Sequence, residues 1–217
     1  MTERSAPERQ YTRSGKLLAT LTVAGALAGL LLVVVNAWTE PRIQAHRAKV
    51  LKEAIEEVLG GPERYETLFL QEGELVATLP AGADSANLDR VYLGYDAGGR
   101  PVGFAIAGGE PGFQDVISLL FGFDPVNERI SGMKVLESKE TPGLGDKIEK
   151  DSAFVASFEG PAAPLVGVKQ GRGSGDAHEV DMITGATISS RTVIDIINHR
   201  LEELEPYLRA YAEAGAP

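Results

Sequence analysis

The stretch with the clearest potential for chemistry is Thr184-Gly185-Ala186-Thr187, which stands between an apolar approach and a helical pattern. A threonine hydroxyl at the start of a helix lies beside unpaired backbone N–H groups and the positive end of the helix dipole, which suits a phosphate. Gly185 and Ala186 add little bulk beside Thr187, so a large group can approach its hydroxyl. In the simpler alternative, Thr184 or Thr187 only caps the last helix.

A second stretch of interest is Glu140-Thr141-Pro142-Gly143-Leu144-Gly145-Asp146-Lys147. Its proline cannot continue a strand ladder, and its two glycines permit unusual backbone angles. Its leucine stands between those glycines with little packing support of its own. The segment is either a plain connector from a strand to a helix or a loop that presents backbone N–H groups and one apolar side chain to a flat ligand.

Antiparallel hairpins are predicted to position these two stretches. Val91, Leu93 and Tyr95 alternate with polar or small residues, and a turn at 97–100 leads to a return strand at 102–107. The glycine-rich segment 108–112 is expected to break the chain. A second hairpin is predicted with strands 116–123 and 130–136 around a turn at 124–128. Residues 75–90 are expected to be a loop.

Two helices and a short strand are predicted in the C-terminal part. The pattern of residues 146–158 favours a helix, and a wide apolar face predicts a last helix that begins at the Thr-Gly-Ala-Thr stretch. Pro206 is expected to end or break that helix, and the tail beyond Ala210 is expected to be loose. Residues 165–168 are predicted to be a short strand, followed by a flexible hairpin loop at 170–177.

A membrane anchor is predicted near the N-terminus. Residues 17–38 form an uncharged, strongly apolar run of 22 residues that ends in Trp38, and about 20 helical residues cross a bilayer core. A cleaved signal peptide is the alternative, but its apolar region is usually about 7–15 residues long. Gly25 and Gly29 form a GxxxG motif that would let another helix approach closely.

Charge and composition limit the function classes. The 217 residues carry a net charge of −10 and no basic patch large enough for nucleic acid. The absence of cysteine excludes disulfides, thiol chemistry and cysteine-ligated metals from this chain, and the three histidines are scattered. Redox work would therefore need an organic cofactor or a metal held by oxygen and nitrogen. Four basic residues precede the anchor and four follow it (Arg42, Arg47, Lys49 and Lys52), so the positive-inside rule barely discriminates between the two orientations. A short basic N-terminus before a first anchor favours a cytoplasmic N-terminus with the larger part outside.

Together, the segments 140–148 and 181–187 resemble the two signatures of the membrane-anchored FMN-binding family. That family includes the G subunit of the Rnf electron-transport complex and the C subunit of the sodium-translocating NADH:quinone oxidoreductase. The resemblance is greater to the Rnf protein and covers nearly the whole chain. Two departures stand out. Gly112-Phe113-Gln114-Asp115 replaces the Gly-Tyr-Ser-Gly often seen in the family, and Ser138-Lys139 replaces a flanking histidine.

The resemblance implies a covalent cofactor. In the family, FMN is attached through its phosphate to the last threonine of the motif, here Thr187, by a separate flavin transferase that uses FAD. It implies that Leu144 lies against the isoalloxazine ring and that Glu140, Thr141 and loop N–H groups line the ring's polar edge. The implied cofactor-binding residues are the following: Thr187, Thr184, Gly185, Ala186, Glu140, Thr141, Pro142, Gly143, Leu144, Gly145 and Phe113. No catalytic residue and no metal ligand are assigned.

We therefore expect an α+β fold, an antiparallel β-sheet flanked by helices with one N-terminal transmembrane helix. The expected parts are a tail at 1–16, a transmembrane helix at 17–38, a juxtamembrane helix at 39–62, an FMN-binding domain at 63–210 and a tail at 211–217. In that juxtamembrane helix, Thr39 is expected to be the cap and Pro41 to lie in the first turn.

The expected function is relay of electrons through FMN within a membrane-bound, ion-translocating redox complex, with no turnover by this protein alone. The expected partners are the other membrane subunits, the flavin transferase and the membrane, and nucleic acid is not expected. The expected site of action is the bacterial inner membrane, with the FMN domain on the extracytoplasmic side. The alternatives are a membrane-anchored flavin-binding or sensor module and a structural anchor whose threonines only cap a helix.

Overall fold

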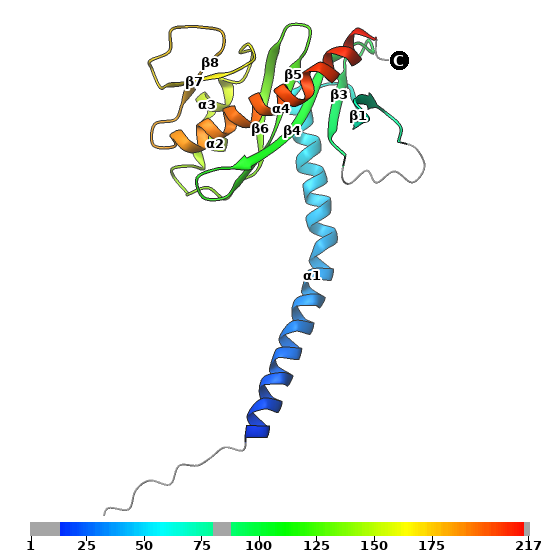
Figure 1. Ribbon diagram of the computed structural model, residues 1–217, viewed down its shortest axis with the longest axis vertical. Coiled ribbons are helices and arrows are strands. Elements are labelled where there is room, and N and C mark those ends of the chain that lie inside the picture. The colour runs from blue at the N-terminus through cyan, green and yellow to red at the C-terminus, as the bar shows by residue number, and fades with distance from the viewer. Residues whose placement is uncertain (1–13, 80–87, 215–217) are drawn as a thin grey trace, which may run out of the picture. The chain divides into compact units, whose positions relative to one another are not determined.

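The computed structural model describes residues 14–79 and 88–214, so most of the predicted N-terminal tail and the last three residues of the predicted C-terminal tail lie outside the described residues. The chain divides into two compact units, residues 1–49 and 50–217. The first unit holds most of helix α1, Ser14–Val58, and the second holds the end of α1 and every other element. Figure 1 shows the order of these elements along the chain.

Helix α1 contains the predicted anchor. Its apolar side chains between Leu17 and Trp38 are exposed, and it is the one helix within the described residues that is long and apolar enough to cross a membrane. The expected juxtamembrane helix is present as a direct continuation of the anchor within α1, whereas its predicted start, with Thr39 as the cap and Pro41 in the first turn, is wrong. Pro41 lies inside α1, and the Thr39 hydroxyl donates to the backbone oxygen of Val35 at 2.9 Å, one turn back in the same helix.

A six-stranded antiparallel sheet forms the centre of the second unit, in the spatial order β2-β1-β3-β4-β5-β6. This confirms the predicted fold class. The strands are β1 Arg64–Gln71, β2 Glu74–Val76, β3 Arg90–Tyr95, β4 Pro101–Pro111, β5 Val116–Asp124 and β6 Arg129–Glu137. Both predicted hairpins are present, as β3–β4 and β5–β6. The first hairpin, β1–β2, was not predicted, and β2 occupies part of the segment expected to be a loop.

The expected break at residues 108–112 is wrong, because β4 continues through Gly108 and pairs with β5 as far as the register Pro111↔Val116. The glycine has a packing reason. A β-carbon at Gly108 would lie 2.6 Å from Cγ2 of Ile196, a residue of the last helix, so the strand needs a residue without a side chain where this helix crosses it.

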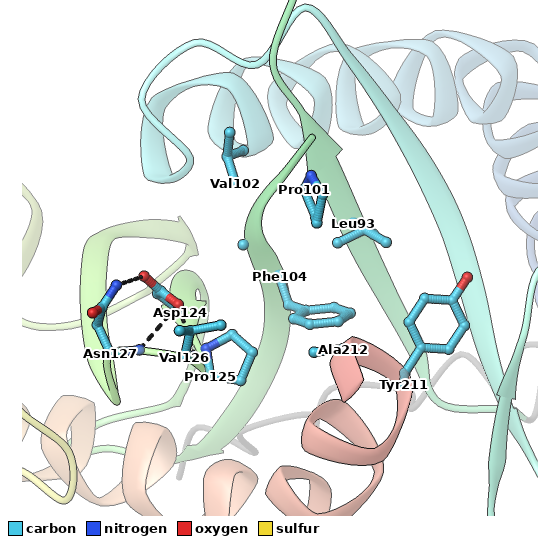
Figure 2. Close-up of a pocket in the computed structure, with 11 residues that line it drawn as sticks. Leu93, Pro101, Val102, Phe104, Asp124, Pro125, Val126, Asn127, Tyr211 and Ala212 are labelled. Carbon is cyan, nitrogen blue, oxygen red and sulfur yellow. Dashed lines mark hydrogen bonds between the residues drawn. The ribbon is translucent and has the colours of Figure 1, made fainter. Parts of the chain in front are cut away.

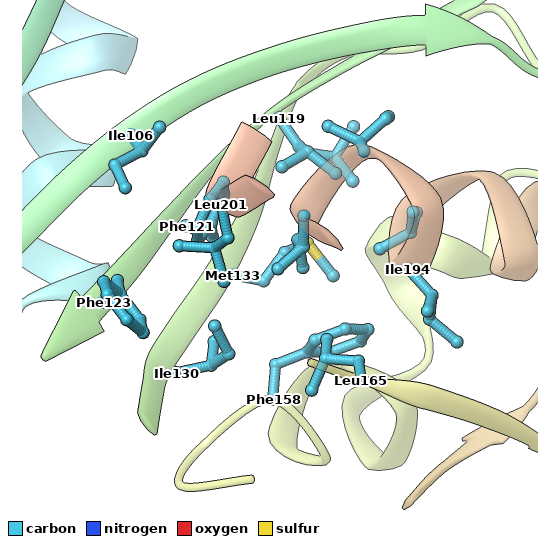
Figure 3. Close-up of a cluster of buried hydrophobic side chains, with 14 of the residues drawn as sticks. Ile106, Leu119, Phe121, Phe123, Ile130, Met133, Phe158, Leu165, Ile194 and Leu201 are labelled. Atoms are coloured by element: carbon cyan, nitrogen blue, oxygen red, sulfur yellow. The ribbon is translucent and has the colours of Figure 1, made fainter. Parts of the chain in front are cut away.

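The sheet is covered on both faces, which explains the run of buried residues in β4 and β5. Phe104, Ile106 and Phe121 face helix α4, Thr187–Glu213, and contribute to the larger hydrophobic core in Figure 3. Ala105 and Leu120 point to the opposite face and form a smaller core with the end of α1. Helix α4 is thereby fixed along the sheet, and its first residue is fixed with it.

The segment predicted as one helix over 146–158 is instead two short helices, α2 Lys147–Lys150 and α3 Ser152–Ala156. Asp151 separates them, because its extended backbone ends α2 while its carboxylate accepts hydrogen bonds from the N–H groups of Ala153 and Phe154 and caps α3. The local sequence pattern does not reveal this break between the two helices, because the spacing of the apolar residues stays helical across Asp151.

Three further predictions for the C-terminal part are wrong. Strands β7, Val166–Lys169, and β8, Glu179–Met182, pair in parallel as a separate two-stranded sheet, so the segment between them returns to the end at which β7 begins and is no hairpin loop. Helix α4 also continues through Pro206 to Glu213, so Pro206 does not end it and the residues directly beyond Ala210 are helical and not loose. Beyond the proline, Leu208 is fully buried in the larger core, and this packing holds the last turns in place.

Candidate functional site

The two glycine-containing motifs meet at a surface cavity of about 330 Å³, within the size range of small-molecule sites. Leu144 and Gly185 lie close together there, because a β-carbon added at Gly185 would stand 3.8 Å from Cδ2 of Leu144. The cavity is lined by Phe113, Glu140, Thr141, Leu144, Gly145, Gly185, Ala186, Thr187, Ile188 and Ser189. Segments predicted separately from the sequence therefore form one site.

Thr187 is the first residue of α4, and it is exposed at the cavity. The residue that precedes the helix is Ala186, which provides no side-chain hydrogen bond to the first turn. Thr184 does not cap either, because its hydroxyl donates to Oε1 of Gln170 at 3.1 Å. The capping role considered for the two threonines is wrong, and within the described residues no side chain caps the first-turn N–H groups of this long helix.

The approach to α4 is held in place from inside the helix. The Ser190 hydroxyl accepts a hydrogen bond from the N–H of Ile183 at 3.1 Å and donates to the backbone oxygen of Ala186 at 2.9 Å. Gly185 has φ of +87°, a conformation that L side chains rarely adopt. This turn lets the chain pass from β8 into α4 while leaving Thr187 open.

Three large apolar side chains at the cavity are exposed to an unusual degree. Phe113 is 67% exposed, Leu144 is 50% exposed and Ile188 is 55% exposed. They come from the β4–β5 loop, from the loop at 140–146 before α2, called here the Pro-Gly loop, and from α4, respectively. An apolar surface of this kind next to unpaired N–H donors fits a planar aromatic ligand that carries an anionic group. The residues present therefore fit a flavin nucleotide.

The Pro-Gly loop owes its shape to Asp146, which is largely buried. Oδ1 of Asp146 accepts the N–H of Gly143 at 2.7 Å, and Oδ2 accepts the Lys150 ammonium at 2.6 Å. The hydrogen bond from Lys150 and that from Gly143, with the lysine charge, lower the pKa of the Asp146 carboxyl although its desolvation opposes this. An ionised side chain thus fixes the turn that exposes Leu144.

Glu140 is the one ionisable residue among those that line the cavity, and it is only 5% exposed. Burial alone would raise its pKa, but hydrogen bonds from the Gln114 and Asp115 N–H groups and the Ser189 hydroxyl outweigh it, so the pKa lies below its ordinary value. The shortest of these bonds joins Ser189 Oγ to Glu140 Oε2 at 2.6 Å. The carboxylate is therefore ionised and occupied by protein donors.

Most of the predicted site residues meet at the cavity, and three do not line it. Pro142 and Gly143 are exposed on the outer side of their loop, and Thr184 contacts Gln170. Thr141 lines the cavity and its hydroxyl donates to Oε1 of Gln114 at 2.9 Å. Sequence reasoning missed Ile188 and Ser189, although their position directly after Thr187 in a helix that begins at the site was a usable signal.

A second cavity, of about 260 Å³, lies at the other end of α4 and is shown in Figure 2. Phe104, Pro125 and Tyr211 line it, together with Asp124 and Asn127. Asn127 Nδ2 donates to Oδ2 of Asp124 at 2.6 Å, so these two polar side chains already pair within the turn. Tyr211 is 24 residues beyond Thr187 in the helix, about 36 Å along its axis at 1.5 Å per residue, so the two cavities are separate.

Comparison with known proteins gives three findings. The family described as FMN-binding domain matches residues 112–202. The chain is 33% identical to the G subunit of the ion-translocating oxidoreductase complex of Photorhabdus laumondii, over 90% of this chain and 94% of the relative. The corresponding protein of Cronobacter sakazakii is 32% identical over the same shares, and that of Methanosarcina acetivorans is 29% identical over 86% of this chain and 92% of the relative.

The fold is also that of two solved proteins. The crystal structure of Shewanella oneidensis NqrC matches with a TM-score of 0.66 and 18% identity, over 76% of this chain and 99% of that chain. The C subunit of the Na(+)-translocating NADH-quinone reductase from Parabacteroides distasonis matches with a TM-score of 0.54 and 24% identity, over 66% and 77%. With its whole-length relatives and its FMN-binding domain, this chain belongs to the family of G subunits of the ion-translocating oxidoreductase complexes.

Proposed function

We propose that this protein is a membrane-anchored electron-carrier subunit of an ion-translocating oxidoreductase complex and that it works through FMN. The relatives that it matches along nearly their whole length are named as subunits of such a complex, and its own residues 112–202 match an FMN-binding domain. When bound, FMN supplies reversible electron transfer. The protein supplies position and electrostatics, taking electrons from a reduced member of the complex and passing them to an oxidised one.

We further propose that FMN is joined to Thr187 by its phosphate. The observation that carries this proposal is the exposed Thr187 hydroxyl at the start of α4, where no side chain caps the first turn. A phosphodiester there would accept first-turn N–H bonds and gain about 0.3–1 kcal/mol from the helix dipole. Phe113, Leu144 and Ile188 are placed to contact the ring.

We propose that a flavin transferase makes the attachment, because Glu140 is the one ionisable residue among those that line the cavity and the described residues there offer no acid–base pair. With FAD as donor, the Thr187 oxygen bonds to the phosphorus of the FMN moiety and the pyrophosphate bond breaks. AMP leaves, and the hydroxyl proton passes to the transferase or to water. Atoms and charge balance without an oxidant or a reductant, so the step is independent of the later electron transfer.

The attachment is tested by denaturing gel electrophoresis of the full chain, produced with and without a flavin transferase. We expect a band that fluoresces under ultraviolet light only with the transferase, and no band from Thr187→Ala. Thr184→Ala is the matched control, because Thr184 pairs with Gln170, and it should keep the band. A fluorescent band from Thr187→Ala would refute the attachment site.

We propose a topology with a cytoplasmic N-terminus, residues 17–38 across the bacterial inner membrane and the FMN domain, residues 63–210, on the extracytoplasmic side. Because the chain lacks cysteine, a single Val126→Cys variant reports the side of its turn, and Val126 is 81% exposed. We expect a membrane-impermeant maleimide to label it in intact spheroplasts. Ser5→Cys in the N-terminal tail is the control and should be labelled only after lysis, whereas the opposite pattern would refute the topology.

A further inference from the structure

The Glu140 side chain joins three segments that are distant in sequence. Its Oε1 accepts the N–H of Gln114 at 2.9 Å, in the loop that carries Phe113. Its Oε2 accepts the hydroxyl of Ser189 at 2.6 Å, in the first turn of α4. Glu140 itself begins the Pro-Gly loop that carries Leu144. One carboxylate thus connects the three segments that carry the exposed apolar side chains of the cavity, Phe113, Leu144 and Ile188.

Two glycines leave room for this carboxylate and for little else. A β-carbon on Gly112 would lie 2.6 Å from Oε1 of Glu140, and one on Gly145 would lie 2.6 Å from Oε2 and 3.0 Å from Oγ of Ser189. Neither glycine has φ in the left-handed region, so close packing against Glu140, and for Gly112 also against Ile117, accounts for both. The two glycines thus approach the carboxylate closely from two sides.

The Glu140 carboxylate therefore has a structural role within the protein, which does not depend on a bound ligand. Both oxygens accept hydrogen bonds from this chain, and hydrogen bonds to a charged acceptor are stronger than those to a neutral one. An amide in place of the carboxylate would weaken these bonds at nearly the same shape. This differs from the role implied by the family resemblance, in which Glu140 lines the polar edge of the ring.

We infer that Glu140 is a positioning residue, whose carboxylate ties the Phe113 loop and the Pro-Gly loop to the start of α4 and so sets the apolar walls between which the ring is held. The inference rests on the proposed function for its consequence, since the ring is the proposed ligand. The tie itself is a property of the flavin-free chain. Its test can therefore be made without flavin.

The test is hydrogen–deuterium exchange of the flavin-free, full-length protein in detergent, followed by mass spectrometry of peptides that cover residues 112–116. We expect Glu140→Gln to speed exchange of the Gln114 amide about fivefold, because its acceptor loses its charge. Glu149→Gln is the matched control, since Glu149 is exposed on α2, and it should leave the segment unchanged. Unchanged exchange in Glu140→Gln, with the β5–β6 peptides also unchanged, would overturn the inference.

A second variant covers a failure of Glu140→Gln to fold. Ser189→Ala keeps the charge and removes the link to α4, and we expect it to speed exchange of residues 112–116 about twofold to fivefold. If exchange there stays at the wild-type rate, the tie to α4 is refuted.

In the flavin-loaded protein, Glu140→Gln should change the visible circular dichroism of the flavin, whereas Glu149→Gln should not. Failure of the wild type to bind flavin would refute the proposed function and leave the exchange result standing.

Discussion

Leu144 lies beside Gly185, with Cδ2 of the leucine 3.8 Å from where a β-carbon of the glycine would stand. The leucine belongs to the Pro-Gly loop and the glycine to the turn before α4, and both line the same cavity, so the two motifs form one site. The leucine is half exposed, at 50%. An apolar side chain held half exposed at a cavity is available to contact a ligand and contributes little to the packing of the core.

Leu144→Ala should therefore separate binding from folding. Because the side chain is half exposed, its loss should lower the free energy of unfolding by about 1 kcal/mol or less. The ring of a bound flavin would lose a contact face and become more exposed to water, so we expect higher flavin fluorescence and faster quenching by iodide. Val126→Ala, in the exposed β5–β6 turn, is the control. Identical quenching in Leu144→Ala and wild type would contradict the contact.

Gly185→Ala should affect both stability and flavin attachment. Gly185 has φ of +87°, so a β-carbon should lower the free energy of unfolding by about 1–2 kcal/mol, and it would stand 3.8 Å from Cδ2 of Leu144 in the cavity that Thr187 also lines. Gly99→Ala is matched in backbone conformation, at φ of +74° in the β3–β4 turn. We expect similar urea midpoints for the two variants but less flavin on Gly185→Ala, and equal flavin on both would count against a role for this turn.

The end of α1 packs against the sheet at Gly122, a position that has no side chain. A β-carbon on Gly122 would overlap the backbone oxygen of Val58 and the hydroxyl of Ser131, and that hydroxyl donates to the Val58 oxygen at 2.6 Å. We expect Gly122→Ala to lower the free energy of unfolding by about 1–3 kcal/mol through overpacking. Gly132→Ala meets its nearest neighbour, Val58 Cα, at 3.2 Å and should cost less. The reverse order in urea unfolding would contradict this packing.

The Glu140 carboxylate should make stability depend on pH in acid. Its pKa is lower in the folded protein than its ordinary value of 4.5, so unfolding takes up a proton. Its contribution is fully present above about pH 4.5 and is lost as the pH falls through the folded-state pKa. We expect the difference in free energy of unfolding between wild type and Glu140→Gln to shrink below pH 4.5. A difference that stays constant from pH 7 to pH 3 would show that the carboxylate is not specially stabilised.

Local patterns were enough to predict the hairpins β3–β4 and β5–β6, the apolar helix near the N-terminus and the start of α4. They were not enough where the outcome depends on distant contacts. Gly108 lies inside β4 because Ile196 leaves no room for a side chain there, and α4 persists past Pro206 because Leu208 is buried. The parallel pairing of β7 with β8 has no local signal, because a glycine-rich connection is compatible with either direction.

The site was predictable in its parts more than in its connections. The exposed Leu144 and the open Thr187 follow from small neighbours in sequence, and both lie at the cavity. The position of Glu140 does not follow from its own segment, since its partners are 26 and 49 residues away. A buried carboxylate is specified by the segments that surround it, and these come together only in the folded chain.

Whether Thr187 carries the flavin is tested most directly by the intact mass of the full-length protein. The protein is purified from cells with a flavin transferase, and peptide mapping then locates the modified residue. We predict a mass increase equal to FMN less one water, located on Thr187 and absent from Thr187→Ala. An unmodified mass from such cells, or the same increase located on Thr184, would contradict the account.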